Sequence, residues 1–561
     1  MNIPGVGEWE SVRRDSWSGN AGRTLRSRVS AANLVGLCGA LLAIAMLIAL
    51  PQPWNLRLPL YLLALGLCIL RPRVALYLMP FAVPWGSLDS IAIGSANLNS
   101  ADILVAFLAA GWLLSFVLHP TAAQPLPGPC DREGLQAPRY FILATMALIG
   151  VMFLSLFVAI NYASSLKEIV KWVEFFVLVL IGSQYIRTRK QLWTLVTLIC
   201  MAAISQAFYG YAQYFLNLGP IAFVRDASLR VYGTFGQPNP FAGYINMTLS
   251  VALALTLLGR GWLLRTCAGV TALLLLAVEL LTQSRGGEIA LAAAVVFIIF
   301  VGMPRLHAVF GLAVIGLLGI VGLFLADFLP ASILLPVARV LGTNQISFTN
   351  PSAQDYSTAE RLAHWIAGIH MFLDHPILGV GIGNYPDAYP HYYITIFVNS
   401  LGHAHNYYIN IAAETGIIGL TVFLCFLIAM FFAAGSALKA VNRKYRLAKA
   451  QQGESRPERV APAGTERKLF LLLHPRRLMQ YYRAQDSRDT LFQLTNDRAL
   501  AIGLLAALLT VCVHNLVDDL YVHSMTNLMA LLLAALIRLA WVTPNVASME
   551  HSVDYAQQTA S

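Results

Sequence analysis

The chain has 561 residues, of which 57% are hydrophobic and only 12% are charged, and its mean hydropathy is +0.64. Soluble globular domains carry about 25% charged residues, so this composition excludes an ordinary soluble protein. Apolar runs of roughly 17–25 residues recur along almost the whole length, and they lack the alternation of β-barrel strands. The expected fold class is therefore an all-α polytopic membrane protein. The net charge of +10 fits basic cytoplasmic loops, so no nucleic-acid partner is expected.

About 12–14 transmembrane helices are expected, with fourteen apolar runs as candidates. The second and third runs are short and could be re-entrant. The runs cover approximately residues 32–50, 57–70, 74–88, 102–118, 140–158, 168–186, 191–217, 241–259, 262–281, 287–303, 306–328, 416–437, 499–516 and 525–541.

The distribution of basic residues predicts the orientation of these spans. Lys and Arg concentrate in cytoplasmic loops, so alternation from a cytoplasmic N-terminus should leave few of them outside. The loop from Lys439 to Arg498 alone holds fourteen Lys and Arg residues against six acidic ones, and it is assigned to the inside. The outside receives eight of the 38 basic residues, namely Arg57, Lys167, Lys171, Arg225, Arg230, Arg285, Arg339 and Arg361.

Six regions follow from this topology. They are a cytoplasmic tail (1–30), N-terminal transmembrane helices (31–220), a region rich in unusual polar sequence (221–437) that includes an outer loop (329–415), a basic cytoplasmic loop (438–498), a C-terminal transmembrane pair (499–541) and a cytoplasmic tail (542–561). The basic loop is either a solvated linker or a segment that lies on the anionic inner leaflet.

The first unusual outer segment runs from Arg230 to Tyr244. Gly233 and Gly236 permit tight turns, and prolines on both sides of Asn239 fix the backbone there. We expect an irregular loop that enters a helix, and such backbone is tolerated at membrane depth only inside protein or along a cavity. A rigid hairpin between spans is the alternative, but the scarcity of outer arginines favours a function for Arg230.

The second segment is the short turn Gln283-Ser-Arg285-Gly-Gly-Glu288 between two apolar runs. Two glycines after Arg285 would let an anion approach free N–H groups at a helix N-terminus. Guanidinium is also the preferred group for bidentate phosphate contacts. The alternatives are that Arg285 pairs with Glu288 or extends to lipid headgroups.

The third segment is the long outer loop. Its residues 358–373 predict an amphipathic helix on the membrane surface, ended by Asp374-His-Pro376. The glycines from Gly379 to Gly383 lack a strand–turn–helix unit around them, so they predict a loop rather than a nucleotide site. The apolar positions of the helix are Leu362, Trp365, Ile366, Ile369, Met371 and Phe372.

Six of the twelve histidines lie in this loop, at His364, His370, His375, His391, His403 and His405. The pair His403 and His405 could chelate a metal, but no cysteine or tight carboxylate cluster joins them in the sequence, so no metal is expected. Most of the six are interpreted as surface or packing residues. His405 differs because it stands next to Asn406, just before a span, where a group that titrates near neutral pH can exchange protons. A last outer turn with Asp518 and Asp519 either orients the basic residues or is a simple polar turn.

These residues resemble the signature of the O-antigen ligase and polymerase superfamily over about residues 225–425. The four motifs, in order, are Gly233-Thr-Phe-Gly-Gln-Pro-Asn239, then Ser284-Arg285-Gly286, then Glu360-Arg361 with Asp374-His-Pro376 and Gly379-Val-Gly381, and finally His405-Asn406 with Gly416 and Gly419.

The resemblance implies a C-type glycosyltransferase architecture in the bacterial inner membrane, with the site facing the periplasm. It also implies an undecaprenyl-pyrophosphate-linked glycan donor, a lipid or glycan acceptor among membrane lipids, and no cofactor. His405 would be the catalytic base, because an acceptor hydroxyl needs one near pH 7. The expected pyrophosphate-binding residues are Arg230, Arg285 and Arg361. The expected supporting residues are Asn239, Asn406, Glu414 and Gly416.

The reaction expected is an inverting transfer of an oligosaccharide or polysaccharide to a hydroxyl, as in an O-antigen ligase. The alternative acceptors are a second repeat unit, as in a polymerase of O-antigen or exopolysaccharide, and a protein hydroxyl, as in an O-oligosaccharyltransferase. A transporter of lipid-linked sugars would instead need charged or broken positions in two related halves. Only Lys171, Glu174 and Glu279 are candidates for such positions, and no repeat is evident. A structural scaffold for envelope assembly would not require Arg230, Arg285 and His405 together.

Overall fold

The computed structural model describes residues 61–118, 137–304, 348–454 and 475–544, apart from a few positions within these ranges. The predicted spans 32–50 and 306–328, part of 57–70, the first tail and most of the second lie outside the described residues. The other eleven predicted spans all coincide with described helices. Eight helices of the described part are long and apolar enough to cross a membrane. The all-α polytopic prediction is therefore confirmed.

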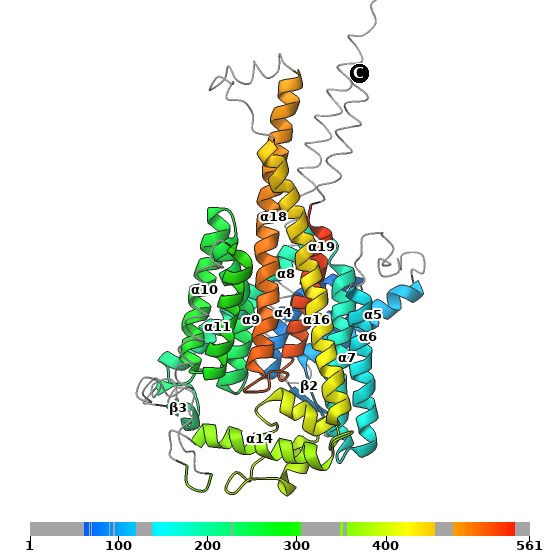
Figure 1. Ribbon diagram of the computed structural model, residues 1–561, viewed down its shortest axis with the longest axis vertical. Coiled ribbons are helices and arrows are strands. Elements are labelled where there is room, and N and C mark those ends of the chain that lie inside the picture. The colour runs from blue at the N-terminus through cyan, green and yellow to red at the C-terminus, as the bar shows by residue number, and fades with distance from the viewer. Residues whose placement is uncertain are drawn as a thin grey trace, which may run out of the picture.

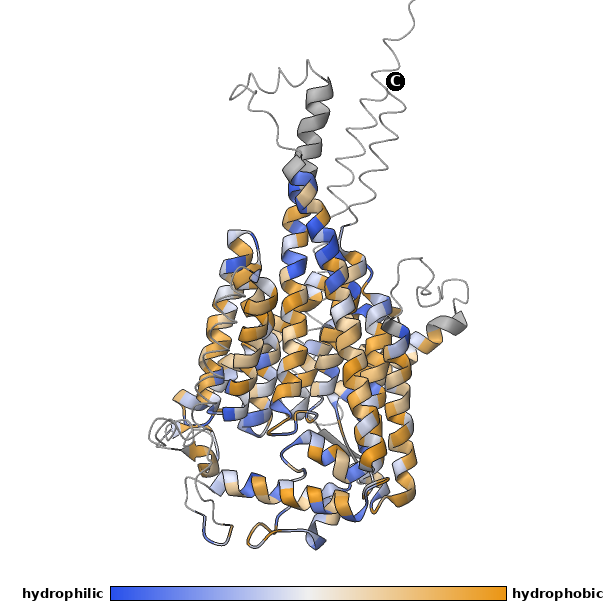
Figure 2. Cartoon of the chain, in the orientation of Figure 1, coloured by the Kyte–Doolittle hydropathy of each residue, from blue (hydrophilic) through white to orange (hydrophobic). Residues whose placement is uncertain are grey.

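The helices of the bundle lie side by side, roughly along its long axis, and consist of apolar residues over most of their length (Figures 1 and 2). They are α4 (Pro72–Trp85), α5 (Ser100–Leu118), α6 (Ala137–Leu154), α7 (Tyr162–Tyr185), α8 (Arg189–Phe215), α9 (Pro238–Leu258), α10 (Trp262–Thr282), α11 (Arg285–Gly302), α16 (Tyr407–Glu454), α18 (Pro475–His514) and α19 (Met525–Val542). Ser284 begins α11 as its N-cap, because its hydroxyl accepts the Gly287 N–H at 3.2 Å.

Helix α14 (Tyr356–Asp374) crosses one end of the bundle, roughly perpendicular to it (Figure 1). The predicted helix and its end at Asp374 are thus confirmed. Short elements complete the fold: η1 (Gly86–Leu88), η2 (Ser155–Val158), η3 (Ile221–Phe223), α15 (Tyr385–Ala388), η5 (Tyr389–His391), and two antiparallel hairpins, β1 (Ser90–Ile93) with β2 (Ala96–Asn99) and β3 (Val224–Arg225) with β4 (Ser228–Leu229).

The core lies where α9, α18 and α19 pack against their neighbours, since most side chains of these three helices are buried. An aromatic cluster joins α7 to α16, with the rings of Trp172 and Phe426 5.4 Å apart and Tyr521 5.1 Å from Trp172. Such edge-to-face pairs add to apolar burial. This packing fixes the turn that precedes α19 against α7 and α16.

The end of the bundle opposite α14 gathers residues that the topology assigned to the inside. Arg189 pairs with Asp497 at 2.9 Å, Lys444 donates to the Ala540 carbonyl at 2.9 Å, and the Arg260 N–H donates to Asn496. We call this the basic end and the α14 side the outer end. The orientation of these two ends in a membrane remains a prediction.

The loop predicted at 438–498 is largely helical where it is described. Helix α16 continues to Glu454 and α18 begins at Pro475, so the two extend together beyond the bundle (Figure 1). Leu491 and Leu494 bury their side chains against Ala448 and Tyr445 in this extension. Charged residues on the remaining faces lowered the hydropathy and hid the helices from a search for apolar runs.

Candidate active site

A kink in α16 shapes the site at the outer end. Gly416 has φ of 64° and ψ of −163°, in the middle of what is otherwise one helix. Hydrogen bonds to the preceding loop replace the helical hydrogen bonds that are lost at the kink. The Ile417 N–H donates to the Pro376 carbonyl, and the Val380 N–H donates to the Ala413 carbonyl. A side chain at Gly416 would clash with the Ile377 carbonyl. Glycine is therefore required there by both backbone and packing.

The run from Gly379 to Gly383 is the loop that fills this kink, as the sequence predicted. All three of its glycines have positive φ. Side chains there would meet Glu414 and Ala413 backbone atoms at Gly379, Ala159 at Gly381 and Ser164 at Gly383. Glu414 ties the loop down, since its Oε1 accepts the Tyr385 N–H at 3.1 Å. Glu414 thus has a structural place behind the site.

Asn406 begins α16, and both ends of its side-chain amide form hydrogen bonds within the protein. Its Oδ1 accepts the N–H groups of Tyr408 at 3.0 Å and Ile409 at 3.1 Å, which is an N-cap. Its Nδ2 donates to the Leu516 carbonyl at 2.8 Å. The residue predicted as supporting therefore joins α16 to the turn before α19.

His405 is held in an uncommon conformation immediately before that cap. Its φ is 52°, and Trp365 of α14 donates its indole N–H to the His405 carbonyl at 3.1 Å. The imidazole Nδ1 lies 3.3 Å from Oδ1 of Asp518. A buried carboxylate at Nδ1 selects the tautomer in which Nε2 carries a lone pair, as a general base requires.

Asp518 connects several candidate residues. Its Oδ1 accepts from His405 and from the Asp519 N–H at 2.9 Å, and its Oδ2 accepts from Asn239 Nδ2 at 2.7 Å. Burial alone raises the pKa of Asp518, but the hydrogen bond and charge of His405, with smaller contributions from His403 and Arg361, hold it well below 3.8. Asp518 is therefore ionised when His405 acts.

His403, His405 and Asp518 form a cluster whose ligand atoms lie within 4.8 Å of one another. The hydrogen bonds do not fit a metal site. His403 Nδ1 accepts the His405 N–H at 3.0 Å, so the ring proton sits on Nε2 and points toward Asp518, 3.8 Å away. A metal-binding histidine donates from its second nitrogen, whereas this one accepts. Burial and the charge of His405 lower the pKa of His403 from 6.5 to about 3, so it stays neutral.

His364 of α14 lies against His405, with ring centroids 5.4 Å apart. The Tyr385 hydroxyl donates its proton to the His364 carbonyl at 2.9 Å. The same hydroxyl oxygen lies 3.2 Å from His364 Nδ1, so Nδ1 carries the ring proton and donates to that hydroxyl oxygen. Its Nε2 is buried without a partner among the described residues. Burial lowers the pKa of His364 to about 4. A second neutral imidazole therefore borders the base.

Arg230 reaches the same network through Asn239, its neighbour across the irregular loop. Arg230 Nη2 donates to Asn239 Oδ1 at 3.2 Å, and Asn239 Nδ2 continues to Asp518. Arg230 Nε also donates to the Thr282 carbonyl at 3.0 Å, next to the turn that carries Arg285. The positive φ at Gly233 and Gly236 and the helix start at Pro238 confirm the predicted loop.

Arg285 lies exposed at the first position of α11, and no ion pair to Glu288 is formed. The two glycines that follow Arg285 are buried. A side chain at Gly286 would meet His514 at 2.9 Å and Val517 at 2.7 Å, so this space is filled by the turn before α19. Gly287 is likewise closed, because a side chain there would clash with the Glu279 carboxyl group. The glycines let α11 pack closely, which brings Arg285 beside the Asp518 turn.

Arg361 lies on α14 beside Glu360, one turn before His364. Its charge contributes to the lowered pKa values of Asp518 and His403, which places it near both. Burial raises the pKa of Glu360 above 4.5, and the charges of His405 and Arg361 oppose this rise. The surface helix therefore presents a cation and a carboxyl group to the His405 region.

The inner face of α14 consists mainly of small residues together with His364 and Met371, whereas Ile369 and Leu373 are 44% and 63% exposed. Exposed apolar side chains of this kind suit the predicted helix in contact with lipid. The buried residues are Ala359, Ala363, His364, Ala367, Gly368 and Met371.

These observations define a multi-pass helical membrane protein with a histidine–aspartate pair and arginines at one end of its bundle. Comparison with known proteins agrees with this class. Residues 270–424 match the model of the O-antigen ligase family, which includes Arg285, Arg361, His405 and Gly416 but not the Arg230 loop. This match covers 155 of the 561 residues and supports a relation of the chain to the O-antigen ligase superfamily of membrane glycosyltransferases. No curated protein matches the chain.

Proposed function

We propose that the protein is an inverting glycosyltransferase that moves a glycan from undecaprenyl pyrophosphate to an acceptor hydroxyl. The observation that carries this proposal is the pairing of His405 Nδ1 with ionised Asp518 at 3.3 Å, close to Arg230 and Arg361. An oriented base beside fixed cations suits a reaction that deprotonates a hydroxyl and releases a diphosphate.

In the proposed reaction the acceptor oxygen attacks the anomeric carbon of the donor. The new C–O bond forms as the bond from that carbon to the pyrophosphate oxygen breaks, which inverts the anomeric centre. The acceptor proton moves to His405 Nε2, and Asp518 stabilises the resulting imidazolium. Arg285, Arg230 and Arg361 stabilise the negative charge that develops on the leaving pyrophosphate.

The donor and acceptor would reach this site from the membrane. The apolar stripe of α14, with Ile369 and Leu373 exposed, suits a helix at the lipid interface that frames the entrance. The concentration of basic residues at the opposite end favours a periplasmic active site in the bacterial inner membrane. The lipid tail of the donor would then extend between spans.

The acceptor would be a glycan or lipid. We rank two acceptors equally, lipid A core for a ligase and a second repeat unit for a polymerase, and we rank both above a protein hydroxyl. All three acceptors use the same donor chemistry, so the residues around His405 suit each of them. The extension of α16 and α18 lies at the opposite end of α16 from His405 and does not favour one acceptor.

The test is transfer in vitro by purified protein from an undecaprenyl-pyrophosphate glycan. His405→Ala should lower the rate by about 10²–10⁴-fold without changing the melting temperature, because a positioned base contributes that much. Arg285→Ala should also lower the transfer rate, because the negative charge on the leaving pyrophosphate would be less stabilised. His391→Ala and Arg265→Ala, two exposed residues outside the four motifs, serve as matched controls.

Full activity of His405→Ala would remove the base assignment. Parallel reactions with lipid A core, with lipid-linked repeat unit and with an acceptor protein identify the acceptor. Product formed with retained anomeric configuration would contradict the single-displacement mechanism.

A further inference from the structure

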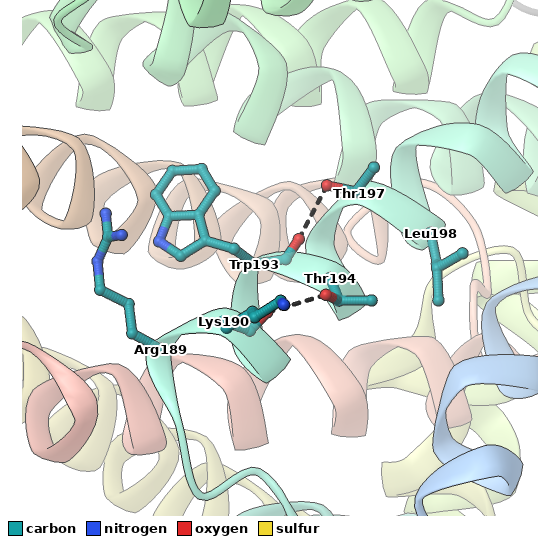
Figure 3. A pocket seen from close by; sticks show the side chains of 6 residues that line it. All are labelled: Arg189, Lys190, Trp193, Thr194, Thr197 and Leu198. Carbon is teal, nitrogen blue, oxygen red and sulfur yellow. Dashed lines mark hydrogen bonds between the residues drawn. The ribbon is translucent and has the colours of Figure 1, made fainter. Parts of the chain in front are cut away.

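A groove of about 440 Å³ lies at the basic end of the bundle, opposite the end at which α16 begins after His405. It runs along one face of α8 and is lined by Arg189, Lys190, Trp193, Thr194, Thr197 and Leu198 (Figure 3). This volume is in the range of small-molecule sites, roughly 300–1,000 Å³. Nothing in the glycosyltransferase reaction uses these residues.

The head of the groove is built on a buried carboxylate. Asp497 of α18 is fully buried and accepts from Arg189 Nε at 2.9 Å and from Trp193 Nε1 at 3.0 Å. The Arg189 guanidinium also lies over the Trp193 ring, 5.3 Å from its centroid. These contacts use Nε and Nη2 of Arg189 and fix the side chain, which leaves Nη1 for another ligand.

Lys190 adds a cation that no described residue neutralises. Its side chain is exposed, and among the described residues its ammonium group has no ion-pair partner. Asp497 offsets the charge of Arg189, so Lys190 leaves a net positive charge at the head of the groove. A phosphate is the anion that Lys and Arg together bind well.

The groove becomes apolar as it leaves this head. The hydroxyls of Thr194 and Thr197 donate to the Lys190 and Trp193 carbonyls one turn earlier, at 2.9 Å each, so they offer no donor hydrogen to a ligand. Leu198 lies eight residues beyond Lys190, about 12 Å along the helix at 1.5 Å per residue. Trp193 stands between Lys190 and Leu198 in the sequence of α8, and tryptophan is enriched at membrane–water interfaces.

We propose that this groove binds one anionic membrane phospholipid, with its phosphate at Lys190 and Arg189 and an acyl chain along Thr197 and Leu198. A ligand with a charged head and an apolar tail matches the groove, which is cationic at one end of α8 and apolar further along the helix. The site is separate from the glycan donor site, so the proposal is independent of the proposed function.

The experiment is lipid titration of the full-length protein in detergent, followed by native mass spectrometry. Phosphatidylglycerol should bind with one saturable site that phosphatidylcholine does not fill. Lys190→Ala should weaken this binding roughly fivefold, in line with about 1 kcal/mol for a basic residue near an anionic lipid. Lys439→Ala, an exposed lysine of α16 outside the groove, is the matched control.

A second variant tests the tail without changing charge. Thr197→Trp should fill the groove and reduce lipid binding, whereas Met201→Trp, one turn further along the exposed face of α8, should not. Equal lipid binding by wild type, Lys190→Ala and Thr197→Trp would overturn the proposal. Loss of bound lipid on addition of millimolar inorganic phosphate would also overturn it, because the site would then bind a phosphate anion alone.

Discussion

Exchanging the acid and the amide of the Asp518–Asn239 pair separates the role of charge from that of geometry. In Asp518→Asn, Oδ1 must remain the acceptor for His405 and for the Asp519 N–H. The new amide nitrogen then takes the place of Oδ2 and faces Asn239 Nδ2, which lies 2.7 Å from that position. Asn239 cannot turn over without losing its bond to Arg230.

Two donors therefore oppose each other in a buried site. One unsatisfied buried donor costs about 1–3 kcal/mol, and relief of that cost would rotate the amide introduced at position 518 toward His405. The rotated amide would present a donor to Nδ1, so the imidazole proton would move to Nε2 and the base would be lost. We expect Asp518→Asn to lower kcat by roughly 10²–10⁴-fold.

Combining Asp518→Asn with Asn239→Asp restores complementary hydrogen bonds. The carboxylate at position 239 accepts from Arg230 on one oxygen and from the amide at position 518 on the other, so Oδ1 at position 518 again faces His405. Coupling between residues in contact is about 0.5–3 kcal/mol, and about 1.4 kcal/mol is tenfold in rate. We expect the double variant to recover at least about tenfold in kcat over Asp518→Asn.

The assay is the glycan transfer rate of wild type, Asp518→Asn, Asn239→Asp and the double variant under identical conditions, with melting temperatures to exclude unfolding. A double variant no faster than Asp518→Asn would refute the hydrogen-bond reasoning. Unchanged kcat in Asp518→Asn would refute the tautomer argument altogether.

Three further outcomes are expected. Gly416→Ala should lose at least about 2 kcal/mol of stability, measured as a lower melting temperature, because φ is 64° and the space is filled, whereas Gly435→Ala, with nothing within 4 Å, should not. Burial raises the pKa of Asp519 from 3.8 to about 6, so the folded state binds the extra proton and its stability falls as pH rises from about 4 to 6. Asp519→Asn should remove this loss of stability, which amounts to at most about 3 kcal/mol. The same dependence of melting temperature on pH in wild type and Asp519→Asn would contradict the raised pKa of Asp519. Trp365→Phe should lower kcat/KM about three- to tenfold by freeing the His405 carbonyl, and an unchanged kcat/KM would show that the turn holds without the indole.

The spans and the His405 motif could be predicted because their signals are local. Apolar runs of the required length appear directly in the sequence, and each described run from 74–88 onward became a helix. The motif that contains Gly416 could be found by resemblance, but the reason that glycine is required there could not. Gly416 is constrained by the Ile377 carbonyl, which reaches it only through the folded loop. Local patterns do not contain such contacts.

The same limit explains why the sequence left the role of Asp518 open. It lies 113 residues from His405 and 279 from Asn239, in a turn whose composition is also typical of an ordinary polar connection. The glycines after Arg285 contact the same turn from α11, because Gly286 packs on His514 and Val517. The turn before α19 therefore does two things at once: it supplies the carboxylate for His405 and provides the surface against which α11 places Arg285. A substitution that moves this turn, such as Gly286→Leu, should impair both the base and the leaving-group cation, and its effect should not add to that of Asp518→Asn.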